Sequence, residues 1–250
     1  MKKLFACVCA GLMALTLTAC GGKDEGSKEL VVQTNSGYNP YEMVDAEGNL
    51  YGFDIDLMNA LAQEAGYSVK WEDVDFDGIV SSVKTGKADI GIAGITYSAK
   101  RAKQVDFSDI YYAGEDAQNY VLTNDDGKMK TTDDIKGKII GTQIGTIQEA
   151  ILTSIKDEYN LTIDQRKSYA DLAVELKKHV VDAMVVEKKV AEEIMEVNEG
   201  LTCYKLEAGS ELAGNAMIFK KESPLKDEFN AALKALKENG KLDELIKKYF

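Results

Sequence analysis

Two blocks of this chain alternate short apolar segments with amphipathic segments of helical period, and this alternation limits the fold more than any other feature. In the first block, three apolar runs flank two stretches in which apolar residues recur every three or four positions. We predict strands at Leu30–Val32, Tyr67–Trp71 and Ile90–Ala93 and helices at Phe53–Ala65 and Phe76–Lys84. Strands that alternate with helices form largely parallel sheets with helices on their faces. The block therefore predicts an α/β fold.

The same alternation starts again in the second half of the chain. We predict strands at Lys138–Thr142, Asp182–Val186 and Leu201–Leu206 and helices at Thr146–Lys156, Tyr169–Lys178 and Val190–Val197. The segments Ala113–Leu122 and Ala213–Phe219 read as extended connections between the blocks, and two amphipathic helices follow at Ser223–Asn239 and Leu242–Tyr249.

These segments predict two α/β lobes with mixed sheets, joined by two crossing hinge strands. The first lobe is expected at 29–113 plus 213–250 and the second at 119–206, with the hinge at 113–118 and 207–213. The first lobe is then discontinuous in sequence.

The first nineteen residues resemble a secretion signal. Two lysines precede an uncharged apolar run, Leu4–Leu17, that is too short to span a bilayer comfortably. Ala19 followed by Cys20 resembles the bacterial lipobox, in which the cysteine becomes the lipidated first residue, and an ordinary signal peptide is the alternative. We expect residues 1–19 to be removed, lipid on Cys20 to tether the protein to the outside of the cytoplasmic membrane, and residues 20–28 to be a flexible linker.

Charge and cysteine content exclude several kinds of partner. The 42 acidic residues outnumber the 30 Lys and Arg, giving a formal net charge of −12. Such a chain repels phosphate backbones, so we expect no nucleic-acid partner. Cys203 is the one cysteine left after Cys20, so no disulfide framework is expected. The acidic run at 73–78 resembles the start of a calcium loop, but its closing position is Lys84, and we expect neither a metal nor a cofactor.

Arginine is rare in this chain. Arg101 and Arg166 are the two arginines among the 30 basic residues, and Arg101 follows the small polar turn at 93–96. A chain that uses lysine for almost every cation has no general need of guanidinium, so Arg101 indicates a geometric demand. Planar, forked recognition of a carboxylate is such a demand, and lysine meets it poorly. The alternative is a surface ion pair with Asp106 or Asp109.

Several motifs together resemble one known family. These are Gly52–Leu57, Phe76–Ile79, Asp89–Arg101, Asp106–Asp109 and Asn239–Phe250. In this order they resemble the family 3 bacterial solute-binding proteins, the polar amino-acid binding proteins of ABC importers, over about residues 29–250. The resemblance implies a type II periplasmic-binding-protein-like fold, with hinge closure of two lobes on the ligand. It also implies an extracytoplasmic, monomeric protein that delivers a free amino acid to an ABC permease.

The resemblance further implies which positions face the cleft. These are Asn35, Tyr38, Phe76, Ala93, Gly94, Thr96 and Arg101 in the first lobe and Gln143, Thr146, Ile147, Gln148 and Glu187 in the second. Arg101 matches the position that binds the α-carboxylate, and Glu187 matches the acid that takes the α-amino group, where the family commonly has Asp. A buried zwitterion needs a fixed cation for one end and a fixed anion for the other. A solvated acid at a helix start is the alternative for Glu187, and a plain core residue is the alternative for Phe76.

The ligand is less defined than the site. Asn35 stands where family members that bind cationic side chains often carry Asp, and Gln143 is neutral too. The turn at 93–96 looks closest to the glutamine-binding members, which favours an uncharged polar amino acid. Glu115 and Asp116 near the hinge leave a cationic ligand open.

Two other functions fit the same fold. An enzyme such as the related cyclohexadienyl dehydratases would need an acid and base in the cleft beyond the ligand clamps, and the spacing of Asp75 and Glu187 does not demand one. A ligand sensor for a signalling partner is the third function, and the chain ends at Phe250 without a signalling segment. We therefore expect a transport receptor and no enzymatic activity.

Overall fold

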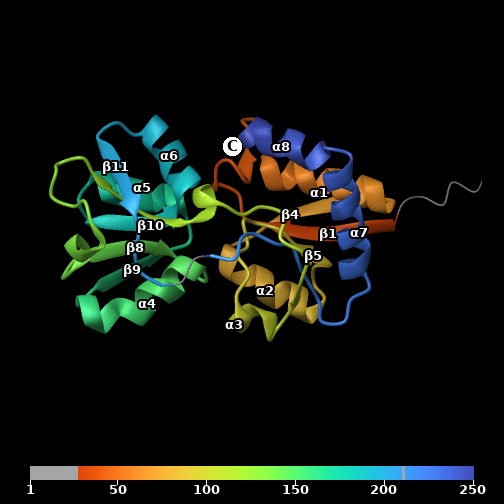
Figure 1. Ribbon diagram of the computed structural model, residues 1–250, viewed down its shortest axis with the longest axis horizontal. Coiled ribbons are helices and arrows are strands. Elements are labelled where there is room, and N and C mark those ends of the chain that lie inside the picture. The colour runs from red at the N-terminus through yellow and green to blue at the C-terminus, as the bar shows by residue number, and fades with distance from the viewer. Residues whose placement is uncertain (1–27, 210–211) are drawn as a thin grey trace, which may run out of the picture.

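The chain forms two lobes, each built on its own five-stranded sheet, as the computed structural model in Figure 1 shows. The structure describes residues 28–209 and 212–250. The predicted signal, Cys20 and all but the last residue of the predicted linker lie outside the described residues. The predicted α/β, two-lobed fold is confirmed.

The sheet of the first lobe has the strand order β4-β1-β5-β12-β6. Its strands are β1 (Lys28–Thr34), β4 (Tyr67–Asp73), β5 (Ile90–Gly91), β6 (Asp106–Phe107) and β12 (Ile218–Phe219). Strand β1 runs parallel to both β4 and β5, whereas β12 runs antiparallel to β5 and β6. The sheet is therefore mixed, and its strand β12 comes from the chain that returns from the second lobe.

Helices cover both faces of this sheet (Figure 1). They are α1 (Phe53–Ala65), α2 (Phe76–Thr85), α7 (Leu225–Glu238) and α8 (Lys241–Tyr249), with the short α3 (Ala99–Ala102) near one end. Helix α1 packs against α7 and α8, while α2 packs against β5 and β12 on the opposite face. The apolar residues of α1 recur at helical spacing and are buried, with Phe53, Leu57 and Leu61 fully inaccessible. A small hairpin, β2 (Met43–Val44) and β3 (Leu50–Tyr51), precedes α1.

The second lobe has the strand order β11-β7-β10-β8-β9. Its strands are β7 (Asn119–Asn124), β8 (Ile139–Gln143), β9 (Thr162–Arg166), β10 (Ala183–Glu187) and β11 (Leu201–Lys205), and its helices are α4 (Ile147–Tyr159), α5 (Tyr169–Lys177) and α6 (Lys188–Val197). Alternate residues of β10 enter different apolar clusters: Val185 packs with Leu152 of α4, and Met184 packs with Leu172 of α5. Helices on both faces explain why all of β10 is buried.

Two chain segments cross between the lobes. The first was expected to be extended over Ala113–Leu122, but a 3-10 turn at Glu115–Ala117 interrupts it before β7 begins. The side chain of Gln118 joins this segment to the returning one, because its Oε1 accepts from the backbone N–H of Leu212 at 3.1 Å and its Nε2 donates to the carbonyl of the same residue at 3.4 Å. The boundaries of the hinge at 113–118 and 207–213 stay a prediction.

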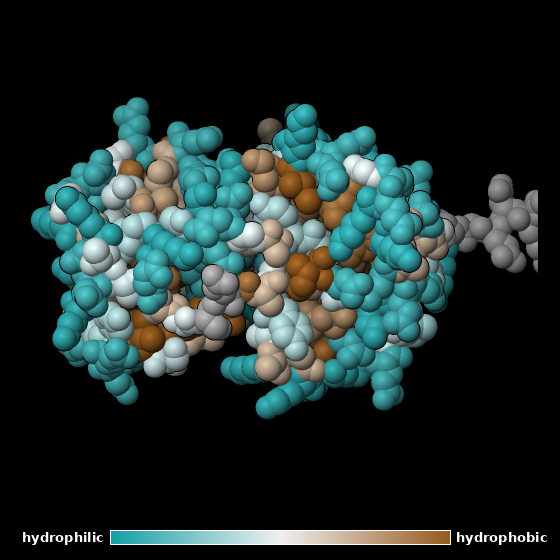
Figure 2. Space-filling view, viewed as in Figure 1, coloured by the Kyte–Doolittle hydropathy of each residue, from teal (hydrophilic) through white to brown (hydrophobic). Residues whose placement is uncertain are grey.

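The surface of the molecule is mainly hydrophilic on the face that Figure 2 shows, with hydrophobic residues in small separate groups. Within residues 28–209 and 212–250, no helix has both the length and the apolar character needed to cross a membrane.

Candidate functional site

All twelve predicted site residues line one pocket between the two lobes. The pocket has a volume of about 310 Å³ including the part open to solvent, and Glu42 and Tyr169 line it as well. The two sheets place most of these residues at or after strand ends: Asn35 follows β1, Gln143 ends β8 and Glu187 ends β10. In α/β folds the carboxyl ends of strands are the usual place for ligands.

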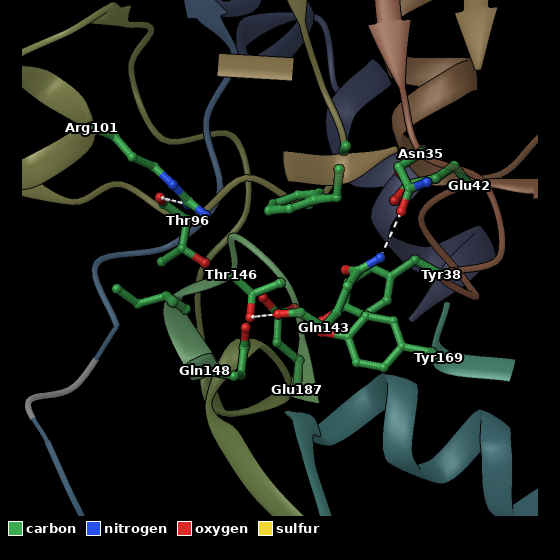
Figure 3. A pocket seen from close by; sticks show the side chains of 14 residues that line it. Asn35, Tyr38, Glu42, Thr96, Arg101, Gln143, Thr146, Gln148, Tyr169 and Glu187 are labelled. Carbon is green, nitrogen blue, oxygen red and sulfur yellow. Dashed lines mark hydrogen bonds between the residues drawn. The ribbon is translucent and has the colours of Figure 1, made fainter. Parts of the chain in front are cut away.

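Arg101 lies at one end of the pocket, far from Asn35 and Glu42 in the view of Figure 3. Helix α3 holds it, and this short helix begins at Ser98, whose hydroxyl accepts from the N–H of Arg101 at 3.2 Å. The guanidinium donates to the carbonyl of Thr96 at 2.7 Å and, across the cleft, to the carbonyl of Gly145 at 3.0 Å. These two bonds leave further N–H donors of the fork for a ligand carboxylate.

The guanidinium of Arg101 is buried without an acidic partner among the described residues. Its exposed fraction is 8%, and burial lowers its pKa to about 10, so it stays charged at neutral pH. Its carbon Cζ lies 5.4 Å from the centre of the Phe76 ring. Asp106, a partner considered in the alternative, pairs with Lys221 instead at 2.8 Å. The alternative of a surface ion pair for Arg101 is therefore wrong.

Glu187 supplies a carboxyl group from the second lobe. It is 1% exposed, and Tyr41 of the first lobe donates its hydroxyl to Oε2 at 2.7 Å. Burial is the main cause that raises its pKa to about 8. The alternative of a solvated helix-start acid is wrong, because the side chain faces the pocket and is inaccessible.

Glu42 is a buried carboxyl that was not among the predicted site residues. It is 1% exposed and lines the pocket near Asn35 (Figure 3). A tight turn places it there, because the N–H groups of Tyr41 and Glu42 both donate to the carbonyl of Tyr38, at 2.8 and 3.1 Å. Burial, followed by the neighbouring Asp54, raises the pKa of Glu42 well above its usual range. The sequence indicates only the turn, since Asn39-Pro40 lies beside Tyr38, and nothing in it distinguishes Glu42 from the other acidic residues.

Aromatic rings from both lobes form one wall of the pocket. The ring of Tyr38 lies between Tyr41 and Tyr169, with centroids 5.4 and 5.0 Å away. Tyr169, the first residue of α5, comes from the second lobe and was also missed. Such aromatic walls provide a large apolar contact area for a ligand side chain. Phe76 lines the pocket and is half-buried, so it is not a plain core residue.

The start of α4 forms the other side of the pocket. The hydroxyl of Thr146 caps this helix by accepting from the N–H of Glu149 at 3.2 Å and donates to the carbonyl of Gln143 at 2.7 Å. Ile147 and Gln148 form the first turn, and Gln148 donates to the side chain of Asn119 at 2.9 Å. A capped helix start presents backbone N–H groups that favour an anion.

Several hydrogen bonds cross between the lobes beside the pocket. The amide of Gln143 donates to Asn35 at 2.8 Å, and the amide of Asn39 donates to Glu193 at 2.6 Å (Figure 3 shows the first). Gly145 approaches the start of α2 so closely that a Cβ atom on it would lie 3.0 Å from Cα and from Cβ of Asp77. The lobes are therefore in direct contact around the site.

Carboxyl groups outnumber basic groups in the pocket. Among the lining residues are the carboxyl groups of Glu42 and Glu187 and the single guanidinium of Arg101. The described residues contain no cluster of three His, Cys, Asp or Glu side chains that is suited to a metal ion. The arrangement can hold a small molecule that carries one anionic group and more than one cationic group.

Two lobes with opposed charged groups in a pocket between them define a two-lobed receptor for a small solute. The chain belongs to the bacterial extracellular solute-binding proteins, family 3, whose model matches residues 30–250. It is 37% identical to the arginine-binding extracellular protein ArtP of Bacillus subtilis (strain 168) over 100% of this chain and 98% of that protein.

Solved structures agree with this assignment. An ancestral arginine-binding protein bound to arginine has a TM-score of 0.82 and 31% identity, over 89% of this chain and 98% of that one. An ancestral arginine-binding protein bound to glutamine has a TM-score of 0.81 and 31% identity, over 89% of this chain and 97% of that one. The ancestral amino acid-binding protein AncCDT-1, a precursor of cyclohexadienyl dehydratase, has a TM-score of 0.78 and 31% identity, over 89% and 95%.

The predicted family is thus confirmed, and with it the predicted function. The protein acts outside the cytoplasm, captures an amino acid between its lobes and delivers it to an ABC importer.

Proposed function

We propose that the captured ligand is a cationic amino acid, arginine in the first place. Arg101 binds the α-carboxylate, Glu187 binds the α-ammonium group and Glu42 accepts from the cationic side chain. A cationic amino acid carries one negative and two positive charges, which match the one guanidinium and two carboxyl groups of the pocket. The relatives described as arginine-binding support the same ligand.

Glu42 is the observation that carries this proposal. The neutral ligand favoured by Asn35 and Gln143 would leave this carboxyl buried without a cationic partner. Burial of a polar or charged group without a partner costs free energy. Asn35 and Gln143 then provide neutral amide oxygens that also suit a guanidinium. The rings of Tyr38, Tyr169 and Phe76 enclose the aliphatic part of the ligand.

Isothermal titration with arginine, lysine, ornithine, histidine, glutamine and citrulline tests the ligand. We expect one site per chain with micromolar or tighter affinity for arginine, and at least tenfold weaker binding of citrulline, its neutral analogue. Glu42→Gln should weaken arginine at least tenfold, about 1.4 kcal/mol, and change glutamine less. Glu47→Gln, an exposed residue of the same β2–β3 region, is the control and should leave affinity unchanged. Tighter binding of glutamine than of arginine would overturn the proposal.

The protein binds its ligand without turnover, as a monomer whose lobes close about the segments 113–118 and 207–213. The titratable groups of the pocket are all assigned to holding the ligand, which leaves none free as a separate acid or base. Incubation of each ligand with the protein, followed by proton NMR of the ligand, should show no new compound. Appearance of a product would establish an enzyme on this fold instead.

Lipid on Cys20 holds the protein at the outer face of the cytoplasmic membrane. The support is the apolar run Leu4–Leu17, which is followed by Ala19 and Cys20. We expect Cys20→Ser to lose metabolic labelling with a fatty acid and to appear in the medium or in the soluble fraction. The control is Cys203→Ser, which changes a half-buried cysteine of β11 and should keep the label. Unchanged labelling of Cys20→Ser would refute the anchor.

A further inference from the structure

A third buried carboxyl, Asp54, lies behind Glu42 and outside the lining of the pocket. It is fully inaccessible and sits in the first turn of α1. Its Oδ2 accepts from the backbone N–H of Gly94 at 2.7 Å and from the hydroxyl of Tyr111 at 2.9 Å. Asp54 therefore ties the start of α1 to the segment 93–96, which itself lines the pocket.

The backbone holds Glu42 and Asp54 next to each other. The N–H of Asp54 donates to the carbonyl of Tyr41 at 3.0 Å, so the residue after that carbonyl, Glu42, lies beside the helix start. Gly52 permits this approach, because a Cβ atom there would lie 2.3 Å from the carbonyl oxygen of Tyr41 and its φ of +133° suits glycine. The loop and the helix are thus in backbone contact next to both acids.

Each of the two acids has one oxygen atom that lacks a hydrogen-bond partner. These atoms are Oε2 of Glu42 and Oδ1 of Asp54, and both are buried. Two buried carboxylates cannot both stay charged in contact, and a proton between them supplies the missing hydrogen bond. In agreement, burial raises the pKa of Asp54 to about 7, and burial followed by the neighbouring charge of Asp54 raises that of Glu42 well above its usual range.

The groups that face Glu42 are almost all acidic or neutral. They are Tyr38 and Tyr41 of its own loop, Asp54 of α1, Asp73 of β4, Tyr111, Tyr169 of α5 and Glu187 of β10, with Arg101 also lining the pocket. Within the described residues, no basic side chain forms an ion pair with Glu42 or Asp54. No basic side chain of the described residues is therefore placed to neutralise Glu42.

We infer that Glu42 and Asp54 form an acid pair that shares one proton, and that the cationic side chain of the ligand displaces this proton when it binds. This inference rests on the proposed cationic ligand. In the step, the O–H bond of the pair breaks, the proton passes to water or buffer, and the ligand cation replaces it against the carboxylate of Glu42. A neutral side chain brings no positive charge and leaves the proton in place. The pair thus selects for a cation and makes capture release acid.

Titration calorimetry in two buffers measures this proton. Arginine is titrated at pH 7 into the full folded protein in phosphate and in Tris, which differ in ionisation enthalpy, and the difference in apparent enthalpy gives the number of protons released. We expect arginine to release about one proton more than glutamine does. In Glu42→Gln, whose amide can still donate to Asp54, the excess should disappear. Glu47→Gln should retain it.

The outcomes separate this inference from the proposed function. If arginine binds at one site but releases no more protons than glutamine, or if Glu42→Gln releases as many as the unchanged protein, the shared proton is refuted and the ligand assignment stands. If arginine does not bind, both fall together. If Glu42→Gln binds arginine too weakly for calorimetry, the comparison of arginine with glutamine in the unsubstituted protein tests the inference by itself.

Discussion

Arg101 and Arg166 are the two arginines of the chain, and the structure gives them opposite surroundings. Arg166 pairs with the carboxylates of Asp164 and Glu175 and is about one-third exposed. Arg101 is buried, donates to two carbonyl groups and has no acidic partner among the described residues. A buried guanidinium without a counter-charge is costly unless an anionic ligand supplies one.

Removal of the Arg101 guanidinium should abolish most of the affinity for the ligand. We expect Arg101→Ala to raise the Kd at least about a hundredfold, on the order of 3 kcal/mol, because a buried carboxylate would lose its charged donor. Arg101→Lys should recover little, since an ammonium group cannot replace the planar fork. Arg166→Ala is the matched control and should leave Kd unchanged in calorimetry. A loss below threefold for Arg101→Ala would remove this residue from the site.

Single residues differed in how well the sequence could predict them. Arg101 stood out as a rare guanidinium after a turn, whereas Glu187 was assigned through the resemblance to the family and its place after an apolar strand. Glu42 and Tyr169 did not stand out, because one of many acids and one of twelve tyrosines carry no such contrast. Their place in the pocket depends on the turn at 38–42 and on the approach of α5 to the first lobe, which are tertiary features.

Among the elements, the connection between β8 and α4 is one of the parts of the second lobe that contact the first directly. Gly145 in this connection has a φ of +81°, and its carbonyl accepts from Arg101. The space for a side chain is taken by Asp77 at the start of α2. This connection limits how near the two lobes can come.

A methyl group at Gly145 should therefore hinder closure more than folding. We expect Gly145→Ala to weaken ligand binding at least tenfold, about 1.4 kcal/mol, and to leave a larger radius of gyration in X-ray scattering with saturating ligand. Gly137→Ala is the control: it has a similar φ of +74° in the same lobe but no atom within 4 Å of the added Cβ. Both variants should lose about 1 kcal/mol of folding stability, because alanine disfavours positive φ. Equal affinities for the two variants would contradict a role of Gly145 in closure.

Elements with a strong apolar period followed from the sequence, whereas several others did not. Helices such as α1, α2 and α7 have a strong apolar period, and the predicted α1 at Phe53–Ala65 matches the observed bounds. The 3-10 turn at Glu115–Ala117 and the short hairpin β2–β3 have no such period. Packing against neighbouring elements defines them, and a single sequence does not show that packing.

On the scale of the whole molecule, buried acids in and behind the pocket link stability to pH. Burial raises the pKa of Glu187 from 4.5 to about 8 and that of Asp54 from 3.8 to about 7. At a pH between the unfolded and the folded pKa of each acid, the folded protein holds a proton that the unfolded chain has released. Stability from these groups is therefore full below about pH 4 and is lost as pH rises through 7 and 8.

The ligand-free protein should become less stable as pH rises from 5 to 8.5. We expect the thermal unfolding midpoint to fall by about 5 °C over this range, with a slope of at most about 1.4 kcal/mol per pH unit for each proton. Exposed acids with lowered pKa, such as Asp45 and Asp134, act below this window and do not alter the sign. Glu187→Gln should flatten the dependence in calorimetric scans. A midpoint that rises from pH 5 to 8.5 would show that these acids are ionised in the folded state.

Gln118 gives the connection between the lobes a mechanical property. Because its side chain bonds to Leu212 of the opposite crossing segment, we expect the two segments to bend together when the lobes move. Such coupling would favour rotation of the lobes about one hinge axis over a free twist. The importer would then encounter two distinct conformations, one of the liganded receptor and one of the ligand-free receptor. Loss of the Gln118 amide would make these two conformations less distinct.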